Sequence, residues 1–236
     1  AIIITDERYQ LALEEFESDE VVATISRDYY GSVNKICEGL NLTVLGYEDT
    51  ISYHLFDAFD ELMTSDIVPF HHLIEKMRLV KDSTEINKLR AAAELQSAGY
   101  DYFLSIVHPG ITERELAIKL DYWMRMQGAS GPSFPTIVAS GANSAKPHAT
   151  ASSKPIADGD VVTLDFGYYL DGYTADMTRT FAVGSIDPEL RDIYKIVNEA
   201  RQLVIDHAKV GIRGNELDAY GRALIEEAGY GDEFNH

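Results

Sequence analysis

The chain has 236 residues, and its 39 Asp and Glu against 20 Lys and Arg give it a formal net charge of −19. This charge argues against nucleic acid and anionic membrane surfaces as partners, because both repel an acidic protein. Hydrophobic residues make up 45% of the chain, which is typical of a globular protein. No apolar run approaches the length needed to cross a bilayer, and no signal peptide is visible.

Cys37 is the single cysteine of the chain, so no intramolecular disulfide can form. One cysteine in a chain of this size is typical of a reducing compartment, and we expect a cytoplasmic protein. We interpret Cys37 as a small buried hydrophobic residue and not as a nucleophile.

The first third of the chain alternates short strands with helices. Strands are predicted at residues 2–5, 21–25 and 42–45, and helices near residues 8–16, 30–38 and 52–62. This alternation favours a small α/β domain over residues 1–72 with a largely parallel sheet. No catalytic signature occurs in it. We interpret His54, His71 and His72 as surface or packing residues, because no carboxylate is positioned to join them in a metal site.

Four helices are predicted in residues 73–236 from their capping residues. Asp82 with Glu85 begins the first, and Thr112 begins the second, which runs to about residue 127. Pro188 begins the third, and Gly229 ends a fourth that starts near residue 215. The expected buried stripe of the first helix consists of Ile86, Leu89, Ala93, Tyr100, Phe103 and Val107.

Residues 108–129 and 209–230 resemble each other at an offset of 101 residues. The coinciding pairs are Gly110/Gly211, Ile111/Ile212, Glu115/Glu216, Leu116/Leu217 and Gly128/Gly229. Each copy follows a long amphipathic helix, so we expect an internal duplication. Strands follow the first copy from about residue 134, and the strands of a second copy would begin near residue 235.

Residues 161–184 read VVTLDFGYYLDGYTADMTRTFAVG and predict a β-hairpin. Asp171-Gly172 is a strong turn signal between two alternating runs. Centring the turn on this pair places Asp165 opposite Thr178 and Asp176 opposite Gly167. The two aspartates are then diagonal neighbours on one face of the hairpin.

The two faces of this hairpin differ in character. The core face carries Val162, Leu164, Phe166, Ala175, Met177, Phe181 and Val183, and the opposite face is small and polar. Two carboxylates so close repel each other unless a cation lies between them, which one or two divalent ions would satisfy. From these residues alone, a solvent-facing strand pair with incidental acids remains an alternative.

The segments LDFGYYLDGYTADMTRT (164–180) and SGANSAKPHA (140–149) resemble the pita-bread metallopeptidases, in particular their Xaa-Pro dipeptidase and aminopeptidase P branch. The resemblance covers about residues 70–236. It implies an α+β fold, with an incomplete pita-bread (creatinase/aminopeptidase-like) C-terminal domain at 73–236 after a partial creatinase-type α/β domain at 1–72. It also implies a homodimer.

The resemblance implies roles for four residues. Asp165 and Asp176 would bind two divalent metal ions, for which Mn, Co and Zn suit the ligands. His148 would be catalytic and contact the substrate, and His236 would assist as a second catalytic histidine. The implied activity is metal-assisted hydrolysis of the peptide bond preceding proline in Xaa-Pro di- or oligopeptides.

One departure from the family pattern concerns the ligands. The family uses five, and three of them, a histidine and two glutamates, would follow residue 236. We therefore expect this chain alone to bind metal weakly and to be inactive. Two alternatives are a catalytically inactive pita-bread binding module and a metal-free hydrolase of the creatinase type. The presence of both Asp165 and Asp176 argues against each of them.

Overall fold

The computed structural model describes residues 1–14, 16 and 18–235, and the chain forms two compact units, Ala1–Lys81 and Asp82–His236. The boundary expected at residue 72 thus differs from the division observed, which leaves residues 73–81 in the first unit. In the part of the chain that the structure describes, no helix is both long enough and apolar enough to pass through a bilayer.

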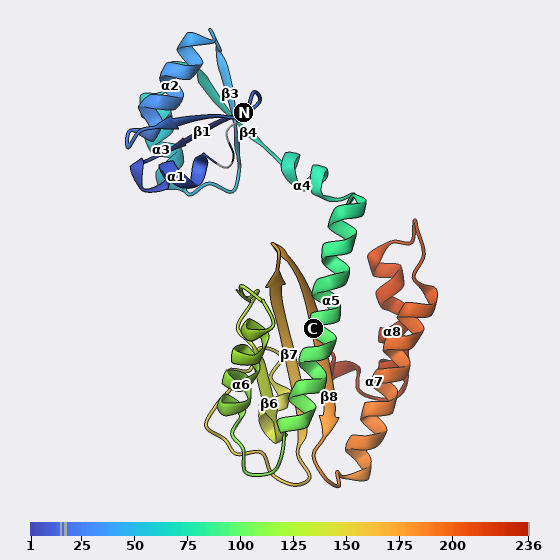
Figure 1. Cartoon of the computed structure of the whole chain (residues 1–236). Helices are drawn as coiled ribbons and strands as arrows, with labels where there is room; N and C mark the ends of the chain where they lie inside the picture. Colours follow the sequence, from blue (N-terminus) through green and yellow to red (C-terminus); the bar gives the residue numbers. More distant parts are fainter. Residues whose placement is uncertain (15, 17, 236) are drawn as a thin grey trace. The chain divides into compact units, whose positions relative to one another are not determined.

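The first unit alternates strands and helices, as expected (Figure 1). Its elements are β1 (Ile2–Thr5), η1 (Glu7–Tyr9), α1 (Gln10–Leu13), β2 (Val22–Ile25), α2 (Tyr29–Gly39), β3 (Val44–Glu48), α3 (Tyr53–Leu62), β4 (Asp66–Phe70) and α4 (Leu73–Arg78). β1 pairs with β2 and β3 with β4, both in parallel. The described strands of this unit therefore form two separate parallel pairs.

Two details of this unit differ from the sequence prediction. The helix expected near residues 8–16 is a 3-10 turn followed by the short α1. β4 is not among the strands that the sequence predicts, and it contains Pro69, which cannot donate a ladder hydrogen bond. Pro69 lies opposite Tyr47 in the pairing with β3. Cys37 is 2% exposed, as predicted.

The second unit combines helices with an antiparallel sheet. Its elements are α5 (Ser83–Ile106), α6 (Glu113–Met126), β5 (Gly131–Pro132), β6 (Ile137–Ser140), η2 (Gly141–Ala145), β7 (Val161–Leu170), β8 (Tyr173–Ala182), α7 (Pro188–His207), α8 (Gly214–Glu227) and η3 (Gly231–Glu233). β7 pairs with β8 on one side and with β5 and β6 on the other. α5 packs against β7 and β8, and α6 against β6 (Figure 1).

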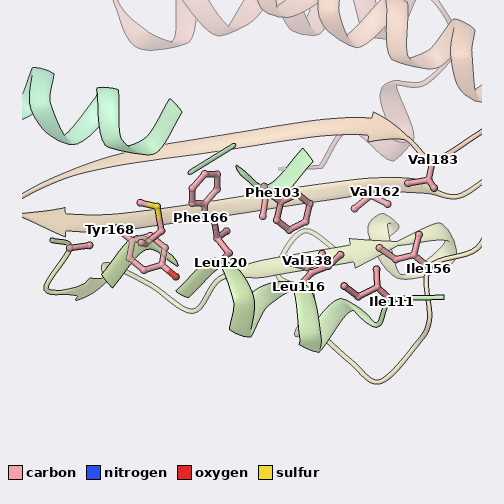
Figure 2. Packing of buried hydrophobic residues seen from close by; sticks show 13 residues of the cluster. Phe103, Ile111, Leu116, Leu120, Val138, Ile156, Val162, Phe166, Tyr168 and Val183 are labelled. Atoms are coloured by element: carbon pink, nitrogen blue, oxygen red, sulfur yellow. The ribbon is translucent and has the colours of Figure 1, made fainter. Parts of the chain in front are cut away.

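The hydrophobic core lies between these two helices and one face of the sheet. Figure 2 shows Phe103 of α5 and Leu116 of α6 beside Val162 and Phe166 of β7. All four side chains are fully buried. Alternate residues of β7 enter this core, so the other alternate set, which includes Asp165, faces the opposite side of the sheet.

The buried face of α5 agrees with the predicted stripe only in part. Phe103 is fully buried, and Tyr100 and Val107 pack half-buried against the core. Ile86 and Ala93 are exposed, and the other buried residues of the helix are Ala92, Gln96 and Gly99. Gly99 is needed at its position because a Cβ there would lie 2.5 Å from the Met124 Sδ. The Gln96 side chain donates a hydrogen bond to the Phe166 carbonyl. Close packing and one backbone acceptor therefore decide which side of α5 is buried.

The predicted helix boundaries agree with the structure. Asp82 and Thr112 each form a complete capping box, and α7 begins at Pro188. The bounds of α6 and α8 differ by the same 101 residues as the sequence repeat. Gly110 and Gly211 also share a positive φ, of 94° and 88°. The same local structure thus occurs in both copies, which supports the expected duplication.

Candidate functional site

The β7–β8 hairpin has the predicted register. Its two-residue turn has a positive φ at both Asp171 (49°) and Gly172 (80°), the conformation that type I′ hairpins require. Asp165 lies opposite Thr178, and Asp176 lies opposite Gly167. The local turn chemistry therefore places the two aspartates on one face and on a diagonal.

The carboxyl groups of this pair influence each other. Burial, the negative charge of Asp165 and a side-chain hydrogen bond with Asp165 together raise the pKa of Asp176. The Thr178 Oγ1 donates to the Asp165 Oδ1 over 2.9 Å, which orients that carboxylate. Two oxygen-rich groups that repel each other fit a divalent cation, because the cation supplies the missing positive charge.

The described residues supply only these two ligands at this place. Within residues 1–14, 16 and 18–235, no group of three or more His, Cys, Asp or Glu side chains is arranged to hold a metal ion. His236, expected to be a second catalytic histidine, lies outside the described residues and stays a prediction. A complete metal centre therefore needs ligands beyond Asp165 and Asp176.

The sheet face that carries the aspartates is partly covered. Gly167 is buried, and a Cβ at this position would lie 2.4 Å from the Ser133 Oγ and 2.7 Å from the Phe134 Cε1. Ser133 also donates its backbone N–H to the Gly167 carbonyl over 2.9 Å. The segment before β6 thus lies against the hairpin beside Asp176, on the face that the sequence analysis describes as small and polar.

His148 belongs to a loop on the same side of the sheet as Asp165. Ile137 of β6 lies opposite Asp165 and therefore shares its face. Ile137 and Ala139 form a small buried cluster with Ala149, the residue after His148. The His148 side chain is exposed. The structure therefore brings the histidine segment to the face that carries the aspartate pair.

Glu113, which the sequence analysis did not single out, anchors this loop. Its Oε1 accepts hydrogen bonds from the Ser140 N–H (2.7 Å) and Oγ (2.9 Å). Its Oε2 accepts from the Ser152 N–H (3.0 Å) and Oγ (2.6 Å), and the Asn143 amide donates to both oxygens. Burial raises the pKa of Glu113, but the hydrogen bonds from Ser152 and Ser140 outweigh it, so the net pKa is lowered.

One sequence signal points to this role. Glu113 and Glu115 both lie in the first turn of α6, but a capping box uses only one acidic side chain, which here is Glu115. Glu113 is left without a local partner, and the loop of residues 140–152 is rich in donors. The sequence does not show that the two meet.

Lys154 strengthens the same network. Its Nζ donates to the Ser140 Oγ over 2.8 Å and forms an ion pair with the Asp160 Oδ2 at 2.6 Å. Burial raises the pKa of Asp160, but the Ala157 N–H and Lys154 outweigh it and lower the net pKa. Two carboxylates thus hold the segment between β6 and β7. The buried Glu113 holds its first part, and the half-buried Asp160 holds its last part.

Two other places, the His71–Asp49 pair and a depression between α7 and α8, differ from the aspartate pair. His71 contacts a carboxylate, contrary to expectation, because its Nδ1 lies 2.7 Å from the Asp49 Oδ2. This exposed pair gains no third ligand among the described residues. An open depression of about 860 Å³ lies between α7 and α8, and none of the predicted site residues lines it. The aspartate pair remains the best candidate.

Comparison with known proteins shows the family of the chain. Residues 87–236 match metallopeptidase family M24, and residues 1–80 match the creatinase/prolidase N-terminal domain. The Xaa-Pro dipeptidase of Pyrococcus furiosus is 40% identical over 199 residues, which are 83% of this chain and 57% of that enzyme.

Solved structures give the same result. The Xaa-Pro dipeptidase from Bacillus anthracis has a TM-score of 0.92 and 42% identity, over 99% of this chain and 66% of its own. The X-Pro aminopeptidase from Thermotoga maritima has a TM-score of 0.88 and 35% identity, over 98% of this chain and 66% of its own. The chain thus spans about two thirds of the length of these structures.

Proposed function

Because the chain belongs to metallopeptidase family M24, with a creatinase/prolidase N-terminal domain, we propose that the protein hydrolyses the peptide bond preceding proline in Xaa-Pro di- or oligopeptides. Its architecture is the α+β pita-bread fold, of which the chain spans part. The observation that carries the proposal is the diagonal placement of Asp165 and Asp176, whose carboxyl groups repel each other on one sheet face.

Four residues of the candidate site have a role in this proposal. Asp165 and Asp176 hold two divalent metal ions, of which Mn, Co and Zn suit carboxylate and imidazole ligands. When bound, such ions polarise a carbonyl group and lower the pKa of water. Thr178 fixes the orientation of Asp165 through its hydrogen bond. His148 contacts the substrate as a hydrogen-bonding group. It stabilises the negative charge that develops on the carbonyl oxygen of the substrate.

The test uses the protein expressed from its complete gene. We expect hydrolysis of an Xaa-Pro dipeptide in the presence of Mn²⁺ and its loss after chelation. Asp165→Asn and Asp176→Asn should each lower kcat/KM by at least about 100-fold, because a neutral amide binds a divalent ion poorly. Asp171→Asn is the matched control, because it removes the same charge from the same hairpin at a turn position that tolerates Asn.

The outcomes separate the alternatives. Hydrolysis that persists without metal would reject the metallopeptidase proposal. Metal binding without hydrolysis of any Xaa-Pro dipeptide or longer peptide would favour an inactive binding module. Comparing dipeptides with tripeptides that begin Xaa-Pro then separates dipeptidase from aminopeptidase activity.

We also propose a cytoplasmic homodimer. The buried lone Cys37 supports a reducing compartment. Large apolar side chains are exposed in the first unit, among them Tyr9 (54%), Leu11 (80%) and Phe16 (62%), and such surfaces favour association. Sedimentation should give twice the monomer mass, and a monomer at high concentration would contradict the dimer.

A further inference from the structure

Glu113 anchors the loop of residues 140–152 at two places on either side of His148, and we propose that it is a positioning residue for that histidine. This inference rests on the proposed function, because it assigns to His148 a part in peptide hydrolysis. Glu113 itself lies in the first turn of α6, three residues before the core residue Leu116. It would act through the loop and not by contact with substrate.

The first argument is the number and kind of partners that Glu113 has. The side chain is fully buried, and its carboxylate accepts hydrogen bonds from two backbone N–H groups, two hydroxyls and one amide. A buried ionised group is costly unless it is hydrogen-bonded, and here both oxygens are. Among these partners, Ser140 is the last residue of β6, and Asn143 and Ser152 belong to the loop that follows it.

The second argument is what lies between the anchors. Ser140 and Asn143 precede His148, and Ser152 follows it. Between them, Ala149 is 5% exposed and packs with Ile137 and Ala139 on the aspartate face of the sheet. The loop is therefore fixed at both ends by Glu113 and in its middle by Ala149, which leaves the adjacent His148 on that face.

The third argument separates this role from helix capping. The Glu115 carboxylate accepts from the Thr112 N–H over 3.0 Å and completes the capping box. Glu113 is not needed for that box, and its bonds reach residues 27 to 39 positions away. The two neighbouring glutamates thus divide the tasks of starting the helix and holding the loop.

The substitution Glu113→Gln tests the anchor with little change in shape. An amide has one acceptor oxygen, and its NH₂ group can only donate. The Ser140 N–H points to one side of the Glu113 carboxylate and the Ser152 N–H to the other. In either amide orientation one backbone N–H therefore loses its acceptor, and one end of the loop is released. Glu115→Gln is the matched control, because Gln serves equally at its capping-box position.

The experiment compares these variants in the protein expressed from its complete gene. We expect Glu113→Gln to keep its Mn²⁺ content, because the aspartates lie on the sheet and not on the loop. Amide hydrogen exchange of residues 140–152 should become faster, and kcat/KM for an Xaa-Pro dipeptide should fall about 10- to 100-fold. Glu115→Gln should stay within about twofold of the parent in both measurements.

A double-mutant cycle with His148→Ala identifies the residue through which Glu113 acts. If Glu113 acts through His148, Glu113→Gln should change kcat/KM by less than about twofold in the His148→Ala background. An equal loss in both backgrounds, a parallel loss of metal, or unchanged exchange of residues 140–152 would overturn the inference. If the parent protein lacks metal-dependent hydrolysis, the proposed function fails, and the exchange comparison alone still decides whether Glu113 anchors the loop.

Discussion

Asp176 of β8 lies opposite Gly167 of β7, and so on the diagonal from Asp165. Like charges placed directly opposite each other destabilise a strand pair, whereas the diagonal lets both side chains reach one point above the sheet. Gly167 has no side chain, and the space that a Cβ would take is next to the Ser133 Oγ and the Phe134 ring. The hairpin thus brings two carboxylates together at a cost that a bound cation would remove.

We predict that Asp176→Asn stabilises the metal-free protein. A carboxyl group whose pKa is raised on folding opposes folding when ionised. This penalty is present above the raised pKa, and it disappears as the pH falls below the ordinary Asp value of about 3.9. In chelator at pH 7 the variant should therefore melt above the parent, although water screening limits the gain to less than about 1 kcal/mol.

The difference in melting temperature between Asp176→Asn and the parent should depend on pH and on Mn²⁺. It should shrink when the melting experiment is repeated near pH 3, and Mn²⁺ should stabilise the parent more than the variant, because only the parent has both carboxylates. Asp171→Asn should not change the melting temperature. A variant less stable than the parent in chelator at pH 7 would contradict the repulsion.

Glu113→Gln is expected to lower the free energy of unfolding by about 1–3 kcal/mol at pH 7, because one buried backbone N–H loses its acceptor. The pKa of Glu113 is lowered on folding, so the ionised group contributes stability above its ordinary pKa of about 4.3. That contribution is lost as the pH falls through the lowered value. Urea unfolding from pH 7 to pH 3 should therefore show the two proteins converging, and a constant difference would contradict this account.

Gly167→Ala should destabilise the second unit by about 1–3 kcal/mol, because the new Cβ would overlap the Ser133 Oγ and lie 2.9 Å from the Ala175 carbonyl. The carbonyl belongs to the backbone of β8 and cannot rotate away. Gly214→Ala is the control, because nothing lies within 4 Å of a Cβ at that position in α8. Urea unfolding measures both, and an unchanged Gly167→Ala variant would show that the segment before β6 is not packed on the hairpin.

The 236-residue chain expressed by itself should bind Mn²⁺ only weakly. Its described residues offer two carboxylates at the candidate site and no cluster of three ligands. Two ligands leave most positions of a divalent ion to water, so little free energy is gained on binding. Titration calorimetry should show weak binding that Asp176→Asn abolishes. Tight binding of two ions per chain would contradict the prediction.

The sequence predicted those features that local chemistry controls. Asp171-Gly172 accepts the positive φ angles of a type I′ turn, and that turn fixed the register that pairs Gly167 with Asp176. The capping boxes at Asp82 and Thr112 likewise gave the starts of α5 and α6. In each case the deciding residues are neighbours in the chain.

The tertiary structure decided the rest. Gln96 and Gly99 lie on the side of α5 that faces the core, because the Phe166 carbonyl and the Met124 side chain lie there. Glu113 is buried because Ser140 and Ser152, far from it in sequence, surround its carboxylate with donors. A sequence gives the residue types and their spacing along the chain, and these determine turns, caps and strand faces. Which distant groups meet depends on packing, and packing placed the histidine loop on the aspartate face.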